Sequence, residues 1–298
     1  MLTYNEILGI IYLQVTAVGF LGNYIILFLN IYNFFITHRM RPVDLIIIHL
    51  AFSNAILLLF GGITSASRIL RVKCLLEELG IRVITYIQTM GRGLSLGSTC
   101  LLSAFQAITI SSNNSRWAQL KIRAPKSIIP CLFLCWVFNL LLDVIIFFCQ
   151  INPQNSTDSN YGCISGYRIL DMNNKDNLKI RILTCVHDSF FLCLMSCFSV
   201  YMVVILYRHR RNVTHIHNKN RSIKISPETK ATQAIVLLVS TFVLFNLFSP
   251  IFMLYMFYFK YPNSWMIHTS AFLSLGYPSV SPFLLIRFDN QIPRTCAH

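Results

Sequence analysis

Residues 182–207 read ILTCVHDSFFLCLMSCFSVYMVVILY, and Asp188 is the one Asp, Glu, Lys or Arg among them. An α-helix rises about 1.5 Å per residue, so a stretch of this length can span the hydrocarbon core of a bilayer, which is about 30 Å thick. Lipid offers no hydrogen bonds to an unpaired backbone, so a spanning stretch of this kind has to be helical. The sequence therefore predicts a membrane-spanning helix here.

Six further segments have the same character. Their approximate ranges are residues 7–31, 43–63, 82–110, 128–148, 231–259 and 265–286. The composition agrees, since 55% of the 298 residues are hydrophobic, 12% are charged and the mean hydropathy is +0.58. We expect an all-α, seven-transmembrane-helix bundle that forms a single domain over residues 1–298. The third segment is the most polar, with Gln88, Arg92 and Gln106, and it is expected at the centre of the bundle, where protein surrounds it.

The distribution of basic residues predicts the orientation. Of the 25 lysines and arginines, fifteen fall on the side of the membrane that holds the C-terminus and nine on the side that holds the N-terminus. Cytoplasmic loops carry the excess of such residues. We therefore expect an extracellular N-terminus and a cytoplasmic C-terminus, with no cleavable signal peptide. Asn155, in the longest outer loop, is the candidate for N-glycosylation because it begins the triplet Asn155-Ser156-Thr157.

Several functional classes find little support. The net charge of +14 could indicate a nucleic-acid-binding protein, but the basic residues lie between apolar runs and not on a polar domain. HExxH and glycine-rich phosphate motifs are absent from the sequence, so we expect no enzyme and no cofactor. The spacing of His and Cys gives no metal site. A proton-coupled transporter remains an alternative, with His49, Arg92 and the intramembrane aspartates as a relay, although helices 4 and 5 would offer no polar groups near the inner face.

Ionisable residues inside the membrane are the first candidates for function, because lipid makes them costly. Arg92 lies about 15 Å from the outer end of its segment, and Asp143 and Asp188 lie about 10 Å from theirs. Opposite charges at similar depth predict an ion pair between Arg92 and one of the aspartates. The pair could fix helix packing, line a ligand cavity open to the outside, or do both. The ligand-pocket candidates are Arg92, Asp143, His187, Asp188 and Phe248.

Helix 6 carries phenylalanines at helical spacing, at residues 242, 245, 248, 252 and 257. Core packing is expected to explain most of them, with one or two facing a cavity. Pro250 is expected to kink this helix because it removes a backbone hydrogen bond.

A basic patch, Tyr207-Arg208-His209-Arg210-Arg211, stands at the inner end of helix 5, and a loop of about twenty residues is expected to follow it. Most such patches are topology signals or anchors to anionic lipid. The alternative is a docking surface for a cytosolic transducer, and both interpretations stay open.

Five long stretches of the chain resemble vomeronasal type-1 receptors. They are MRPVDLIIIHLAFSN from Met40, GRGLSLGSTCLLSAFQAITIS from Gly91, YMVVILYRHRRNVTHIHN from Tyr201, SPETKATQAIVLLVSTFV from Ser226 and YPSVSPFLLI from Tyr277. The resemblance implies a rhodopsin-like G protein-coupled receptor in the plasma membrane of sensory neurons. Such a receptor detects small chemosignals and signals through an inhibitory-type heterotrimeric G protein. A bitter-taste-like receptor is the nearest alternative, and the SPETKATQ and GRGLS stretches argue against it.

The chain departs from the wider rhodopsin-like pattern in ways that the vomeronasal pattern shares. Gln106-Ala107-Ile108 replaces the acidic-arginine-tyrosine motif of helix 3. Asn54 stands where helix 2 usually has an aspartate, which removes the carboxylate that would hold sodium. Ser281-Pro282 replaces the asparagine-proline of helix 7. The resemblance gives Ala107, His209, Arg210 and Arg211 as candidate contacts with the G protein.

Two further expectations depend on the resemblance. Helices 3 and 5 are neighbours in these receptors, so Asp188 is the preferred partner of Arg92. Ile81 stands where the family usually has a cysteine at the outer end of helix 3, while the second outer loop keeps Cys163. Cys74 could replace the missing cysteine if its Cα atom approaches that of Cys163 within about 7 Å.

Overall fold

The computed structural model describes residues 4–38, 40–69, 78–111, 115–151, 175–216, 233, 236–248 and 264–288. The regular structure in this part of the chain is entirely α-helical. The helices are α1 (Tyr4–Thr37), α2 (Pro42–Ile69), α3 (Glu78–Ile110), α4 (Ser115–Ile151), α5 (Lys175–Ile216), the helix Val236–Phe248, and α7 (Ser264–Phe288). Within the described ranges, α1 to α5 are long and apolar enough to cross a membrane, and two shorter apolar helices follow. The all-α, seven-helix fold predicted from the sequence is confirmed.

The turn between α1 and α2 shows how local sequence sets the helix ends. His38 follows the last residue of α1 with a positive φ of 49° and donates its backbone N–H to the carbonyl of Phe34 at 2.9 Å, which is a left-handed C-cap. Pro42 then occupies the first position of α2, where its missing N–H costs nothing. The carboxylate of Asp44 accepts a hydrogen bond from the backbone N–H of Arg41 at 3.0 Å, as in a capping box.

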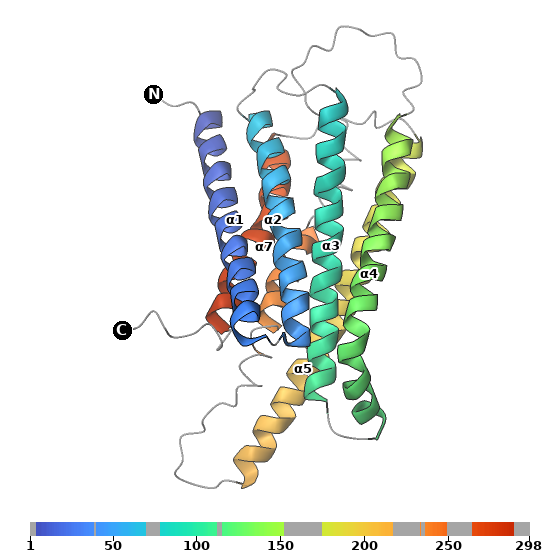
Figure 1. The fold of residues 1–298 in the computed structure, drawn as a ribbon. Coiled ribbons are helices and arrows are strands. Elements are labelled where there is room, and N and C mark those ends of the chain that lie inside the picture. The colour runs from blue at the N-terminus through green and yellow to red at the C-terminus, as the bar shows by residue number, and fades with distance from the viewer. Residues whose placement is uncertain are drawn as a thin grey trace, which may run out of the picture.

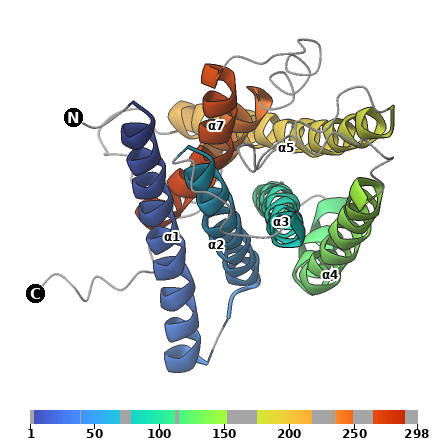
Figure 2. The ribbon, with the colours of Figure 1, turned by 90° about the horizontal axis from the view of Figure 1, so that it is seen from above.

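The helices lie side by side in a bundle, and its two ends can be told apart by which helices begin there (Figure 1). We call the end at which α1, α3, α5 and α7 begin the N-terminal end of the bundle, and the other the C-terminal end. Viewed along the bundle, α3 lies between α2, α4 and α5 (Figure 2). The apolar stretch of α3 is 67% buried inside the protein, against 17% for α5. The central place predicted for the polar third helix is therefore confirmed.

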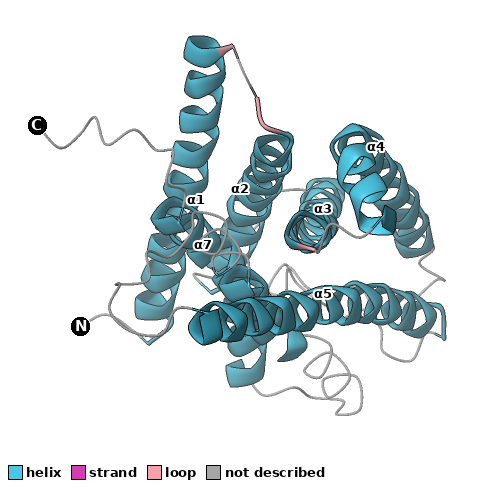
Figure 3. Cartoon of the chain, turned by 90° about the horizontal axis from the view of Figure 1, so that it is seen from below, coloured by secondary structure: helices cyan, strands magenta, loops and turns pink. Residues whose placement is uncertain are grey.

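Glycines let α4 approach α3 closely. A Cβ atom added to Gly93 would collide with Oδ1 of Asn139, and one added to Gly97 would collide with Sγ of Cys135. Gly93 and Gly97 are four residues apart on α3, and Cys135 and Asn139 are four residues apart on α4. Each of these two sets therefore lies on one face of its helix. The view from the C-terminal end shows these two helices next to each other (Figure 3).

One contact between α1 and α7 forms where a proline interrupts the hydrogen bonding of α7. Pro282 has no N–H, so the carbonyl of Pro278, four residues earlier, has no helical partner. Asn23 supplies one, donating from Nδ2 to this carbonyl at 2.9 Å and to that of Gly19 at 2.8 Å. Asn23 is fully buried. A buried amide thus pairs the backbone group that the proline leaves open.

The phenylalanines of helix 6 divide between core and surface. Phe242 is buried and packs edge-on against Tyr277 with ring centroids 4.4 Å apart. Phe245 lies over Gly276, where a Cβ would collide with its ring. Phe248 is exposed at the last residue of the described helix. Phe252, Phe257 and Pro250 lie outside the described residues.

Candidate functional site

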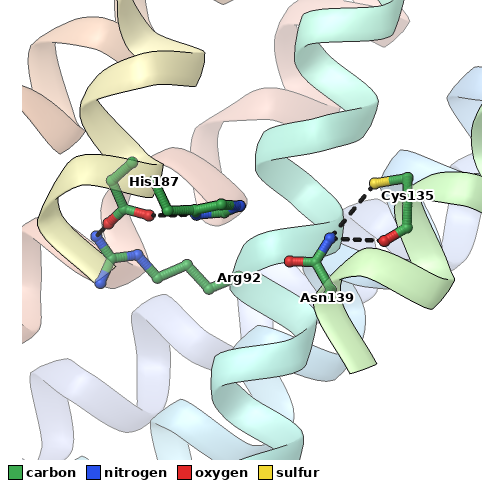
Figure 4. A network of polar contacts seen from close by, with 5 residues as sticks. Arg92, Cys135, Asn139 and His187 are labelled. Atoms are coloured by element: carbon green, nitrogen blue, oxygen red, sulfur yellow. Dashed lines mark hydrogen bonds and ion pairs between the residues drawn. The ribbon is translucent and has the colours of Figure 1, made fainter. Parts of the chain in front are cut away.

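The charged centre of the molecule joins α3 to α5. Nη2 of Arg92 donates to Oδ2 of Asp188 at 2.5 Å (Figure 4). The Arg92 side chain is 24% exposed and that of Asp188 is 10% exposed. A charge in this position has to be paired, and the neighbouring helix provides the partner. The prediction that Arg92 pairs with Asp188, in preference to Asp143, is confirmed.

His187 extends this pair. Its Nδ1 lies 3.3 Å from Oδ1 of Asp188, and its ring stacks on Phe138 at 5.6 Å and meets Phe191 edge-on at 4.9 Å. An ionised carboxylate can only accept, so Nδ1 carries the proton. In a neutral imidazole the other nitrogen, Nε2, then has a lone pair and accepts. Figure 4 shows Nε2 at the far end of the ring from the ion pair.

Asp143 approaches from α4. It is 6% exposed, and its Oδ2 has no hydrogen-bond partner within the described ranges of the chain. It lies four residues beyond Asn139 and therefore on the face of α4 that packs on α3. It lies within electrostatic range of His187 of α5 and of Tyr86 of α3. Four of the five ligand-pocket candidates thus come together toward the N-terminal end of the bundle, on α3, α4 and α5. No described contact brings Phe248 to them.

His49 belongs to a separate neutral network. Nε1 of Trp136 donates to Nε2 of His49 at 2.6 Å, so Nδ1 carries the ring proton. Nδ1 lies 2.6 Å from Oγ of Ser98, whose own hydrogen goes to the carbonyl of Leu94 at 2.6 Å. The ring is therefore fixed between α2, α3 and α4. A transporter relay would need His49 to exchange protons, but here both ring nitrogens take part in hydrogen bonds, one with Ser98 and one with Trp136.

Asn54 also has partners for both ends of its amide. Nδ2 donates to Oγ of Ser281 at 3.0 Å, and Oδ1 accepts from Oγ of Ser95 at 2.6 Å. The three residues come from α2, α7 and α3. Where the wider receptor pattern has an aspartate, this chain has an amide that holds three helices together.

A second link between α3 and α5 lies toward the C-terminal end of the bundle. Ser111 donates to the carbonyl of Ala107 at 2.7 Å, so the hydroxyl of Tyr201, 2.8 Å away, donates to Ser111. The ring of Tyr201 stacks on Trp117 of α4 at 5.8 Å. Ala107 is buried. Sequence reasoning did not single out Tyr201 or Trp136 as contacts, although Tyr201 begins one of the family stretches.

The basic patch lies on a helix that is longer than expected. The predicted segment ends at residue 207, but α5 continues to Ile216 and extends beyond the ends of its neighbours (Figure 1). Residues 209–211 are helical, and the helix continues for more than one turn beyond them. Arg211 is exposed. The side chains of His209 and Arg210 lie outside the described residues, as do Cys74, Asn155 and Cys163.

Comparison with known proteins identifies the family. The model of the vomeronasal organ pheromone receptor family matches residues 6–298. This chain belongs to the vomeronasal type-1 receptor family. The human vomeronasal type-1 receptor 4 is 39% identical over 286 residues, which is 95% of each chain. The human vomeronasal type-1 receptor 3 is 38% identical over 293 residues, covering 96% of this chain and 92% of that one. The vomeronasal type-1 receptor 4 of Pongo pygmaeus is 37% identical over 285 residues, or 95% of each chain.

The family resemblance drawn from the sequence is therefore confirmed. The receptor is a multi-pass membrane protein of the G protein-coupled class and not an enzyme. Membership also decides against the bitter-taste-like and transporter alternatives.

Proposed function

We propose that this receptor binds a small chemosignal from the outer face and activates an inhibitory-type heterotrimeric G protein from the inner face. The partly buried ion pair of Arg92 with Asp188 is the observation that supports this most directly. Intramembrane charges are costly and mark functional sites by default. The pair lies among aromatic rings toward the N-terminal end of the bundle, which is the outer end if the excess of basic residues marks the cytoplasm.

The proposed transmission uses α5, because it is joined to α3 twice. One joint is the Arg92–Asp188 pair, and the other is the bond from Tyr201 to Ser111. A ligand that competes for either charge of the pair changes how α5 is held against α3. Because α5 is one continuous helix to Ile216, the change reaches its basic extension. There His209, Arg210 and Arg211 contact the transducer.

Agonist screening in cells with a G-protein reporter tests this function. A receptor with His209, Arg210 and Arg211 changed to alanine should bind an agonist at the cell surface with nearly unchanged affinity but signal weakly. The matched control changes Lys121, Arg123 and Lys126 of α4 to alanine, removing three basic residues toward the same end. If the control loses as much signalling as the α5 variant at equal surface expression, basic charge in general matters, and the docking proposal fails.

The proposed orientation places this receptor in the plasma membrane of sensory neurons with its N-terminus outside. Asn155 is then on the outer side and can carry a glycan. The variant Asn155→Gln should migrate faster than the parent, as the parent does after glycosidase treatment. An acceptor triplet introduced within residues 217–230 should stay unmodified. A glycan within residues 217–230 and none at Asn155 would show that the receptor has the opposite orientation.

A disulfide between Cys74 and Cys163 is proposed on the outer side, where it would restrain the long loop above the ligand entrance. Ile81 has no thiol, so the first outer loop has to supply the partner. Mass spectrometry of surface receptor under non-reducing conditions should recover the two cysteines in one linked peptide. Two free thiols would reject the bond.

A further inference from the structure

The cluster on α3, α4 and α5 has more acceptors than donors. The charge of Arg92 is taken up by Asp188, and Nδ1–H of His187 also points to that carboxylate. This leaves Oδ2 of Asp143 and Nε2 of His187 without a hydrogen-bond partner among the described residues. Both atoms accept hydrogen bonds when the carboxyl is ionised and the imidazole is neutral. They belong to side chains that are about nine-tenths buried, on two different helices.

Unpaired buried polar groups are uncommon, and each calls for an explanation. A structural role does not explain Asp143, because no cation or donor in the described part of the chain is bonded to its Oδ2. The neutral cluster around His49 shows the contrast, since each nitrogen of that ring has a partner. The acceptors of Asp143 and His187 instead define the chemistry of a group that binds both of them. It needs several N–H or O–H donors, and it needs positive charge to balance the carboxylate.

We propose that Asp143 and His187 form the recognition site for a small molecule with a protonated primary amine. This rests on the proposed function and deepens it by naming the chemical class of the chemosignal. A primary ammonium has three donors and a full charge, so a single group carries enough donors for both acceptors. A hydroxyl has one donor and no charge. The rings of Phe138 and Phe191 pack against His187 and provide apolar and aromatic surface beside the charge.

Matched pairs of small molecules test the proposal. The probes are cyclohexylamine with cyclohexanol, benzylamine with benzyl alcohol, and 2-phenylethylamine with 2-phenylethanol, in which only the amine and hydroxyl differ. Amines of this kind are protonated at neutral pH, like lysine. At least one amine should raise the thermal midpoint of the purified full-length receptor more than its alcohol partner. It should also activate the G-protein reporter at lower concentration.

Variants assign the effect to its residues. Asp143→Asn should remove the preference for amine over alcohol and reduce amine potency at least about tenfold, because a charge-assisted bond is lost. It should not lower the thermal midpoint without ligand, since Oδ2 has no partner to lose. His187→Phe keeps a ring against Phe138 and should weaken the preference without abolishing it. The control Asp44→Asn removes a carboxylate toward the C-terminal end of the bundle, and the preference should persist.

The outcomes separate this site from the coupling proposal. Alcohols that act as well as amines, an amine effect that persists in Asp143→Asn, or amines that never raise the midpoint would each overturn the site. If alcohols or other compounds then still activate the reporter, the receptor function stands without the amine site. If amines stabilise the purified receptor through Asp143 but the reporter stays silent, the site stands and the proposed coupling fails.

Discussion

The cluster around Arg92 lies on α3, α4 and α5, and the network around His49 lies on α2, α3 and α4. The two share α3 and α4 but differ in how their polar groups are satisfied. In the His49 network, Trp136 and Ser98 occupy both ring nitrogens, and no formal charge is needed. In the Arg92 cluster, an ion pair is bordered by two acceptors without donors among the described residues. A satisfied neutral network stabilises one arrangement of helices. A cluster with unmet acceptors instead keeps a requirement that a ligand can fill.

Helix α4 takes part in both regions, which makes the comparison testable within one helix. Trp136 belongs to the neutral network and Asp143 to the charged cluster, and Asn139 lies between them on the same face. Changes at Trp136 should therefore act on stability, and changes at Asp143 on recognition.

Charge reversal in the ion pair should have the largest effect. Arg92→Asp places a second carboxylate against Asp188 in a site where breaking a buried pair alone costs about 3–5 kcal/mol. We expect surface expression or agonist response to be abolished. Combining Arg92→Asp with Asp188→Arg should recover part of either, measured by surface labelling and the G-protein reporter.

Asp143→Arg serves as the control for this reversal. Because the structure pairs Arg92 with Asp188, Asp143→Arg should not rescue Arg92→Asp. Rescue by Asp143→Arg, with none by Asp188→Arg, would show that the partner has been assigned to the wrong helix.

Gly93→Ala should have the next largest effect, because it separates α4 from α3 between the two regions. The new Cβ collides with Oδ1 of Asn139, and overpacking of this kind costs about 1–3 kcal/mol. The matched control is Gly61→Ala, whose Cβ meets Leu275 at 3.1 Å and Gln88 at 3.2 Å, so smaller shifts suffice. Thermal midpoints of the purified variants should fall further for Gly93→Ala. Equal midpoints would mean that the close approach of α4 to α3 is wrong.

Trp136→Phe should have a moderate effect that is confined to stability. The ring is kept, but Nε2 of His49 loses its donor, which costs about 1 kcal/mol. The thermal midpoint should fall while agonist potency at matched surface expression stays close to that of the parent. A shift in potency without a loss of stability would show that the His49 network also takes part in recognition, and the contrast between the two regions would fail.

Arg41→Ala should have the smallest effect. Arg41 pairs with Asp44 at 2.9 Å, but its side chain is 45% exposed. Exposed ion pairs contribute about 0–1 kcal/mol because water screens them and side-chain entropy opposes them. Surface expression should be nearly unchanged, in contrast with Arg92→Asp. A loss as large as that of the buried pair would mean that exposure does not separate the two ion pairs.

The sequence predicted the all-α fold because lipid leaves a spanning backbone little choice but the helix. Apolar length alone predicts a helix over residues 182–207, and charge in a helix predicts that protein surrounds it, as at Arg92. The apolar segment was expected to end near residue 207, and α5 is longer than that segment. Hydropathy predicts the extent of the apolar segment, but the helix itself continues past that segment to Ile216 because its backbone hydrogen bonds do not require apolar side chains.

Which residues pair across the bundle could be learned only from the tertiary structure. The sequence by itself determined that Arg92 requires an opposite charge and that Asp143 and Asp188 are at suitable depth, because burial in lipid penalises any lone charge. The orientation of each helix about its own axis and the close packing of the helices decided which of these residues meet. Gly93 and Gly97 bring the Asn139 face of α4 onto α3, Asp188 meets Arg92, and Asp143 keeps an oxygen with no hydrogen-bond partner in the described part of the chain. Hydropathy cannot give this result, because it depends on which faces meet, and a helix of given composition can present any of its faces.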